Sequence, residues 1–407
     1  MSPLQFARDN AAFLLAGGLL AFTSSYGQTY FISLFAGEIR GEFGLSHGAW
    51  GGIYTLGTLV SALVMIWSGM LTDHFRVKGL ALLVMPGLAL ACLFMALVPG
   101  PALLVVAIFA LRFFGQGMMS HLNVVAMARW YVRRRGLALS ISSMGFAIGQ
   151  AVLPLIFVAL LAMTGWRNLW LLSAVLVLCT LPVVLRLLRL ERTPQALAEE
   201  TDIAGLEGRH WTRAEVLRHP LFWLLVPALL GPPAWGTALF FQQVHIAEVK
   251  PWTLPQWVAL MPFFTVTLIA ANFASGLAID RFGAGRVVML YMLPFLLGFL
   301  ILAAAGGLVA AAVGLMVVAL GQGMQATVPG AFWAEYFGTR HLGAIKSAST
   351  AIMVFGTAIG PGISGVLIDA GIDFPAQMYG LAVYFAVAAI CATLGILKVR
   401  AQLPAPA

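Results

Sequence analysis

Twelve long apolar segments recur along the 407-residue chain and constrain its fold more than any other feature. A helix needs about 20 apolar residues to cross a hydrocarbon core of roughly 30 Å. Hydrophobic residues make up 61% of the chain and charged residues only 9%, a composition outside the range of water-soluble globular domains. The predicted spans, numbered 1 to 12 in chain order, are 12–36, 48–71, 79–98, 102–127, 136–163, 168–188, 220–246, 255–279, 286–304, 308–333, 344–368 and 377–397. The sequence therefore predicts an all-α membrane protein with twelve transmembrane helices.

The basic residues indicate how these spans are oriented. With both termini in the cytoplasm, nineteen of the 23 Lys and Arg residues fall inside. Only Arg40, Arg167 and Lys250 fall outside, and Arg112 lies within span 4. This asymmetry predicts cytoplasmic termini under the positive-inside rule. Span 1 is too long for a cleavable signal and no small-x-small site follows it, so we expect it to be retained in a plasma membrane, the inner membrane in a bacterium.

One polar stretch divides the spans into two sets of six. Residues 191–219 carry mixed charges and no apolar period, which is typical of a solvated connector with a short surface helix around Trp211–Leu217. We expect an N-terminal six-helix bundle over 1–190, a cytoplasmic linker over 191–219 and a C-terminal six-helix bundle over 220–407.

The two halves carry the same short motifs in the same order. The Gly-Gln-Gly-Met run at 115–118 recurs 206 residues later at 321–324, Gly69-x-x-x-Asp73 recurs 207 residues later at Gly276-x-x-x-Asp280-Arg281, and Gly145-x-x-x-Gly149 recurs 211 residues later at Gly356-x-x-x-Gly360-Pro361. Three matches of this kind predict two bundles related by a pseudo-two-fold axis. That layout is typical of transporters, whose substrate site lies near the midplane between the halves.

Each repeated motif has a physical role. Glycines four residues apart let two helix backbones approach closely, and Pro361 supplies a bend. Asp73 and Asp280 follow spans 2 and 8 at their cytoplasmic ends, where a carboxylate can bind a neighbouring helix N-terminus and an arginine. We expect these two residues to form a conformational latch rather than to be ordinary loop charges.

These motifs resemble those of the major facilitator superfamily over essentially the whole chain. The loop motif Gly-x-x-x-Asp-Arg-x-Gly is matched at Gly276, Asp280, Arg281 and Gly283, and less well in the first copy, where His74 and Arg76 replace the usual residues. The helix 4 motif Arg-x-x-Gly-Gln-Gly is matched by Arg112, Gly115, Gln116 and Gly117, whereas Gln150 replaces a common Pro in span 5. The resemblance implies a twelve-helix secondary transporter.

Within the superfamily, the run from Tyr26 to Phe31 resembles the monocarboxylate and oxalate/formate exchanger branch. That resemblance implies an anion substrate. Members of the branch carry an arginine in helix 8 where this chain has Asn272, and their helix 11 lysine has no counterpart, because Lys346 falls near the cytoplasmic start of span 11. A dicarboxylate held by two buried cations is therefore not expected.

Arg112 is the most unusual side chain of the spans, because a charge at bilayer depth is costly unless it faces a polar cavity or has a function. At 100° per residue, Arg112, Gln116, Met119 and Asn123 form one polar stripe on span 4. The offset of 206 residues carries this stripe to Val318, Gln322, Gln325 and Pro329 on span 10, so the arginine has no twin. Tyr26, Tyr30 and Ser33 share a face of span 1, and Phe240 and Gln243 correspond to the last two of them on span 7. Arg112 is either a ligand for an anion or a brace bonded to the main chain of span 1, and the two roles can coexist.

Two histidines lie in the spans. His121 lies opposite Arg112 on span 4, and we interpret it as a packing residue bonded to a neighbouring helix. His245, near the outer end of span 7, is the better candidate for a proton-linked residue, since histidine titrates near neutral pH. Packing and cavity roles are equally compatible with its position.

The leading functional hypothesis is a secondary transporter that moves a small organic anion, monocarboxylate-like, by alternating access. No Asp or Glu lies within a span, and Glu335 stands only at the cytoplasmic end of span 10, which disfavours a cationic substrate. A second hypothesis is efflux of a neutral or amphipathic compound with Arg112 structural, and a remote third is a non-transporting sensor. We find no metal-ligand cluster, nucleotide loop or paired carboxylates, and Cys92, Cys179 and Cys391 lie far apart. We therefore expect no enzyme activity, no cofactor or metal, no nucleic-acid partner, and function as a monomer.

Overall fold

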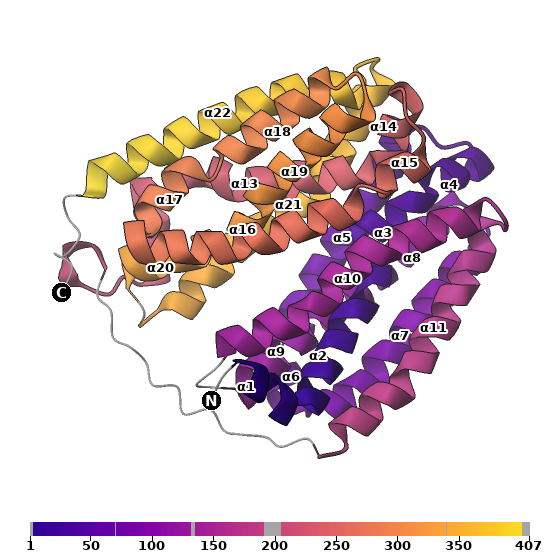
Figure 1. Cartoon of the computed structure of the whole chain (residues 1–407), viewed down its shortest axis with the longest axis horizontal. Coiled ribbons are helices and arrows are strands. Elements are labelled where there is room, and N and C mark those ends of the chain that lie inside the picture. The colour runs from indigo at the N-terminus through magenta and orange to yellow at the C-terminus, as the bar shows by residue number, and fades with distance from the viewer. Residues whose placement is uncertain (1–2, 70, 132–134, 191–204, 339, 401–407) are drawn as a thin grey trace. The chain divides into compact units, whose positions relative to one another are not determined.

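The computed structural model describes residues 3–69, 71–131, 135–190, 205–338 and 340–400 (Figure 1). Within these ranges the chain is helical and contains no strand, which confirms the predicted all-α class. The contacts divide it into two compact units, Met1–Ala198 and Glu199–Ala407.

The helices follow one another with short connections. Unit 1 contains α1 (Pro3–Asp9), α2 (Ala11–Thr23), η1 (Ser24–Gly27), α3 (Thr29–Ile32), η2 (Ser33–Phe35), α4 (Ala36–Phe43), α5 (His47–Ser68), α6 (Leu71–His74), α7 (Val77–Leu97), α8 (Pro101–Leu111), η3 (Arg112–Met119), α9 (Ser120–Trp130), α10 (Arg135–Leu161), α11 (Trp166–Leu187) and η4 (Leu188–Leu190). Unit 2 contains η5 (Leu206–Gly208), α12 (Arg213–Arg218), α13 (Pro220–Phe241), α14 (Gln243–Val249), α15 (Leu254–Val258), α16 (Met261–Phe282), α17 (Ala284–Leu290), α18 (Leu293–Ala304), α19 (Leu308–Gln325), α20 (Val328–Phe337), α21 (Leu342–Asp369) and α22 (Phe374–Val399).

Eleven helical segments of the described ranges are long and apolar enough to cross a membrane, and they coincide with spans 2 to 12. Span 1 differs, because its apolar helix, Ala11–Gly27, is shorter. We expected one helix over 12–36. The structure instead breaks the chain at Gln28, which is extended with φ −87° and ψ 151°.

The same pairs of spans pack together in both units. In unit 1, α2 packs on α10, α5 on α8 and α7 on α11. In unit 2 the corresponding pairs are α13 with α21, α16 with α19 and α18 with α22. Figure 1 shows α7 and α11, and likewise α18 and α22, running side by side. Two six-span units with matching pairs are what the repeated motifs predict.

Helix starts repeat as well. Ser46 precedes α5 and its side chain accepts a hydrogen bond from the backbone N–H of Ala49. Thr253, 207 residues later, precedes α15 and forms a capping box with Gln256. A hydroxyl at this position satisfies a backbone donor that the first turn leaves unpaired. Spans 2 and 8 therefore begin with the same local chemistry.

The glycine motifs of spans 5 and 11 lie against the corresponding partner helix in each unit. A Cβ at Gly145 would collide with the carbonyl oxygen of Gly18 on α2, and a Cβ at Gly360 would collide with that of Ala234 on α13. A Cβ at Gly356 would lie 2.9 Å from the carbonyl oxygen of Leu230, also on α13. The motif glycines therefore allow a close approach to the partner helix in both units, and the pairing of Gly145 with Gly356 stays a prediction.

The expected connector over 191–219 is only partly described, since residues 191–204 lie outside the described ranges. Residues 205–219 belong to unit 2, where the backbone N–H of Trp211 donates to the carbonyl of Phe337. The surface helix expected around Trp211–Leu217 is α12. Glu215 accepts bonds from the backbone and side chain of Thr212 and from Arg209, which lowers the pKa of its carboxyl to about 2.

Candidate functional site

Span 1 is irregular over the stretch that follows α2. Two 3-10 segments, η1 and η2, flank α3, and Gln28 separates η1 from α3. Every residue from Thr23 to Ala36 is buried, and none of them is proline. Non-helical backbone at membrane depth occurs only where protein buries it or where it lines a polar cavity. Since no proline causes this break, the packing around it must maintain it.

Span 4 is also irregular without a proline. The Arg-x-x-Gly-Gln-Gly motif forms a π-helix, η3, over Arg112–Met119. Single-turn π segments inside α-helices are frequent at functional sites. The breaks that precede α18 and α20 differ, because Pro294 and Pro329 there remove backbone donors.

The two irregular stretches meet at a pair of glycines. A Cβ at Gly27 would collide with the carbonyl oxygen of Leu111 and lie 2.7 Å from the Cα of Gly115, while a Cβ at Gly115 would lie 2.6 Å from the Cα of Gly27. Only hydrogen fits between these backbones. This crossing brings the side chain of Arg112 to the break in span 1.

Arg112 spans that break. Its Nη1 donates to the carbonyl oxygen of Gly27 at 3.2 Å and to the Oγ1 of Thr29 at 3.2 Å, so it bonds to the residues on both sides of Gln28. The side chain is buried, and its Cζ lies 5.3 Å from the ring centre of Tyr54 on α5. The brace contact with the main chain of span 1 is therefore present.

The guanidinium of Arg112 also retains a hydrogen-bond donor without a partner among the described residues. Within the described ranges no carboxylate pairs with it, and its buried Nε has no hydrogen-bond partner. Buried donors are normally paired, so an unpaired one needs an explanation such as a water molecule or a ligand. An anion is one group that would satisfy both the charge and this donor.

The polar stripe expected on span 4 is not continuous. The wider turn of η3 invalidates the 100° spacing between Arg112 and Asn123. Arg112 contacts spans 1 and 2, whereas Asn123 is buried where Gly17 of α2 comes close to Ser142 of α10. Gln116 lies between them in sequence and is half-exposed.

The expected face of span 1 is buried and aromatic. Tyr26 packs edge-on against Phe31, with ring centres 5.2 Å apart, and Tyr30 packs against Phe146 at 5.8 Å. Gln28 places its Nε2 3.5 Å from the Oγ atoms of Ser24 and Ser120. Gln28, Thr29 and Tyr54 are polar residues of this region that were not among the predicted site residues. The sequence interpretation assumed a continuous helix in span 1, and it drew no site residue from span 2, where Tyr54 lies.

The candidate residues of unit 2 are scattered. Val318, the counterpart of Arg112, is fully buried where α19 crosses Gly298 of α18. Gln322 is half-exposed and its Nε2 lies against Gly236 of α13. Gln325 ends α19, and Asn272 is half-exposed on α16, where its backbone approaches Gly323. Of this set, Gln322 is the residue whose side chain is seen against span 7.

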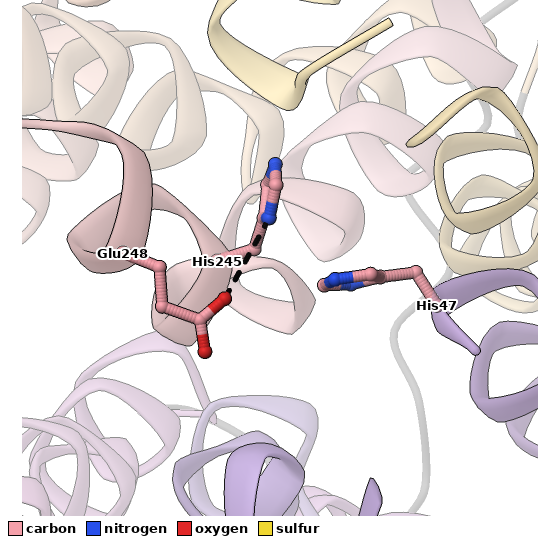
Figure 2. A group of neighbouring side chains, drawn as sticks. All are labelled: His47, His245 and Glu248. Atoms are coloured by element: carbon pink, nitrogen blue, oxygen red, sulfur yellow. Dashed lines mark ion pairs between the residues drawn. The ribbon is translucent and has the colours of Figure 1, made fainter. Parts of the chain in front are cut away.

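The outer part of span 7 carries a second polar group. Phe240 packs against Phe264, Gln243 is buried, and Gln242 donates to the Oγ of Ser364 on α21 at 2.9 Å. Next to them, His245 is buried and its Nδ1 lies 3.8 Å from the carboxylate of Glu248 (Figure 2).

On its other side, the Nε2 of His245 lies 3.6 Å from the carboxylate of Asp373 and accepts a 3.4 Å hydrogen bond from the backbone N–H of Phe374. His245 thus contacts the start of α22. These contacts are compatible with the packing role and with the proton-linked role.

His121 has the contacts of a packing residue. Its Nε2 lies 3.3 Å from the Oγ1 of Thr72 and 3.3 Å from the carbonyl oxygen of Gly69. In unit 2 the equivalent place on span 10 is Thr327, whose hydroxyl bonds to Ser275 on α16 at 2.6 Å. In both units, therefore, this position joins span 4 or 10 to span 2 or 8.

The expected latch is partly described. Asp73 belongs to α6, but its side chain lies outside the described part of the structure. Asp280, near Gly276, is exposed and has no hydrogen-bond or ion-pair partner among the described residues, and Arg281 lies over the ring of Phe282. The carboxylate that binds the start of α17 is that of Glu335, which accepts from the backbone N–H of Ala284 at 2.6 Å.

Comparison with known proteins identifies the family. The Major Facilitator Superfamily model matches residues 17–271 and 253–407. An uncharacterized 38 kDa protein in the 23S RNA operon of Thermoproteus tenax is 33% identical over 143 residues, a match that spans 35% of this chain and only 38% of that relative.

Two solved structures are similar over nearly the whole chain. A bacterial homolog of the human lysosomal transporter Spinster, inward-facing and unoccupied, is 16% identical with a TM-score of 0.72 and covers 98% of this chain and 99% of its own. The nucleoside transporter NupG is 16% identical with a TM-score of 0.73 and covers 94% and 99%. Likeness at this identity shows the fold alone. The chain belongs to the Major Facilitator Superfamily and is a multi-pass membrane protein with the fold of a secondary transporter.

Proposed function

We propose that this transporter moves a small organic anion, monocarboxylate-like, by alternating access, with Arg112 supplying the positive charge that attracts it. The observation that carries the proposal is the state of Arg112: it is buried, has no carboxylate partner among the described residues, and has an unpaired Nε. A charge in a low-dielectric setting acts over a longer range than one in water.

The distribution of acids supports an anion rather than a cation. The buried polar side chains of the described residues include no Asp or Glu. A transporter for cations generally needs a buried acid to offset the cost of removing the substrate from water.

The substrate should carry one negative charge. Asn272 and Val318 stand where a second cation would be expected from the exchanger branch and from the repeat, respectively. Within the resemblance to the monocarboxylate and oxalate/formate exchangers, this favours a monocarboxylate over a dicarboxylate. We propose candidate substrate-binding residues in both units. They are Arg112, Gln116, Asn123, Tyr26 and Tyr30 in unit 1, and Gln243, Asn272, Gln322 and Gln325 in unit 2.

One observation favours efflux of a neutral or amphipathic compound instead. Both bonds of Arg112 Nη1 go to span 1, so the side chain already has a structural role. In that case Arg112→Gln impairs folding more than it changes which solutes are carried.

We further propose both termini in the cytoplasm, a bacterial inner-membrane location, and function as a monomer. His245 is the candidate for coupling to protons, because no carboxylate is buried among the residues that the structure describes. His245→Asn should then abolish stimulation by a pH gradient while leaving exchange of labelled for unlabelled substrate intact, and stimulation that persists would remove this role.

The test is counterflow by purified protein in liposomes with carboxylates and neutral solutes, with and without a pH gradient. We expect counterflow of monocarboxylates in the wild type and a strong loss in both Arg112→Ala and Arg112→Lys, since lysine lacks the planar fork of donors. Anion counterflow that is unchanged in both variants would exclude the anion site. Transport of a neutral solute alone would favour the second candidate.

A further inference from the structure

Thr29 and Tyr54 form a buried chain of contacts with Arg112. The Oγ1 of Thr29 accepts a hydrogen bond from Arg112 Nη1 and is bonded to the hydroxyl of Tyr54. The ring of Tyr54 faces the guanidinium at 5.3 Å. The exposed fractions of Thr29, Tyr54 and Arg112 are 8%, 0% and 2%. Three spans, the first, second and fourth, thus meet at one cation.

The break in span 1 explains why the hydroxyl of Thr29 is available. Several hydroxyls of unit 1 bond to a carbonyl of the preceding helical turn, as Thr23 does to Leu19 and Ser173 to Leu169. Thr29 begins α3 directly after the extended Gln28, so the preceding turn that would offer such a carbonyl is absent. Its hydroxyl therefore turns to Arg112 and Tyr54.

We infer that Thr29 and Tyr54 are positioning residues that set the orientation in which Arg112 meets an anionic substrate. A guanidinium is a planar fork with five donors in fixed directions. Two acceptors fix Nη1, and the ring of Tyr54 fixes the plane. The orientation of Nε, the donor left without a protein partner, follows from these contacts.

The inference rests on the proposed function. It predicts different effects for two kinds of contact, whereas a purely structural role of Arg112 does not. A brace needs the bond to the Gly27 carbonyl. The bonds to Thr29 and Tyr54 set the direction in which Arg112 Nε can donate a hydrogen bond. Loss of either hydroxyl should therefore weaken substrate binding more than it slows turnover.

Four variants test this in liposomes with radiolabelled lactate as the probe. Thr29→Val and Tyr54→Phe each remove one hydroxyl with little change of shape, and Thr29→Ser retains it. Thr58→Val is the matched control, because Thr58 lies one turn from Tyr54 on α5, is buried, and has a hydroxyl without a partner among the described residues.

We expect the KM for lactate to rise on the order of tenfold in Thr29→Val and Tyr54→Phe, as for loss of a bond to a charged group, with kcat little changed. Thr29→Ser and Thr58→Val should remain near wild type. The inference is overturned if Thr29→Val and Tyr54→Phe behave like Thr58→Val, or if they lower kcat at constant KM.

A second measurement needs no substrate. Backbone hydrogen exchange over residues 27–32 should be faster in Thr29→Val and Tyr54→Phe than in wild type, and unchanged in Thr58→Val. If wild-type protein carries no lactate or other anion, the proposed function fails, and exchange alone then decides whether these hydroxyls hold the arginine at the break. Unaltered exchange in both variants overturns the inference.

Discussion

Arg167 in unit 1 and Lys250 in unit 2 bind equivalent pairs of backbone carbonyls. Arg167, at the start of α11, donates to the carbonyls of Ala96 and Val98 at 2.7 and 2.8 Å. Lys250, after α14, donates to those of Ala303 and Ala305, both at 2.8 Å. The acceptors are 207 residues apart, yet the cations come from non-equivalent segments. Two of the three cations that sequence placed outside the membrane thus stabilise the negative ends of α7 and α18.

Lys250→Met should therefore lower the melting temperature of the purified protein. Two unprotected carbonyls remain after the change, at a cost of roughly 1–2 kcal/mol. Differential scanning fluorimetry measures the effect. Lys398→Met, which removes an exposed lysine from α22, is the control and should change the melting temperature much less. Equal shifts in the two variants would contradict the capping role.

Glu42 should make the stability of unit 1 sensitive to acid. Its carboxylate binds Arg167 at 2.7 Å and the indole N–H of Trp166 at 2.8 Å, and the bond to Arg167 lowers the pKa of the Glu42 carboxyl. Because the folded state has the lower pKa, the stabilisation is complete above the unfolded pKa of about 4.3. It is lost as the pH falls through the folded value.

The measurement is the melting temperature between about pH 6 and pH 3, on either side of the ordinary glutamate pKa. Wild type should lose stability on acidification, and Glu42→Gln should be less stable at neutral pH but lose less. Glu38→Gln, on the same helix α4, is the matched control. A parallel decline in wild type and Glu42→Gln would exclude this carboxylate as the cause.

Apolar length and repeated motifs were enough to predict the class, the span order and the two six-span halves. Those properties follow from the hydrophobicity of each segment and from the repeated motifs, both of which can be read directly from the sequence. The break at Gln28 and the π turn at Arg112–Met119 were not predicted, because no proline marks either of them. They depend on the approach of Gly27 to Gly115, a tertiary contact between spans 85 residues or more apart.

The same limit applies to the candidate site. The brace role of Arg112 was among the expectations, and its bond to Gly27 is present. Its other neighbours, Thr29 and Tyr54, lie in spans 1 and 2. A helical wheel shows the faces of one helix, but it does not show which face of one span meets which face of another. A wheel drawn at a constant 100° also assumed a regular helix between Arg112 and Asn123, although η3 interrupts it, and Asn123 lies against Gly17 of α2 and not at the break beside Gln28.

Gly27→Ala should damage the protein severely. The added methyl group meets backbone atoms of Leu111 and Gly115, which cannot rotate away as a side chain can. Overpacking of this kind costs about 1–3 kcal/mol or more. Gly52→Ala is the matched control, since Gly52 lies on α5 with nothing within 4 Å of the added atom, and there alanine should be neutral or stabilising. Melting temperature and yield of folded protein distinguish the two, and similar values for both variants would mean that spans 1 and 4 separate easily.

Glu335 rather than Asp280 should act as the latch in the conformation described here. The carboxylate of Glu335 accepts a 2.6 Å bond from the backbone N–H of Ala284 and lies beside Gly283, which adopts a positive φ of 80° between α16 and α17. A negative charge at the positive end of a helix is favourable, and its amide analogue keeps the acceptor but not the charge. Glu335→Ala should therefore lower the melting temperature by more than Glu335→Gln, and both by more than Asp280→Asn. If Asp280→Asn is as destabilising as Glu335→Ala, this prediction is wrong, and Asp280 is an acid that holds this end of the unit. Counterflow rates of the same three variants then show whether either acid limits the conformational change, because a latch that stabilises one state must slow the exit from it.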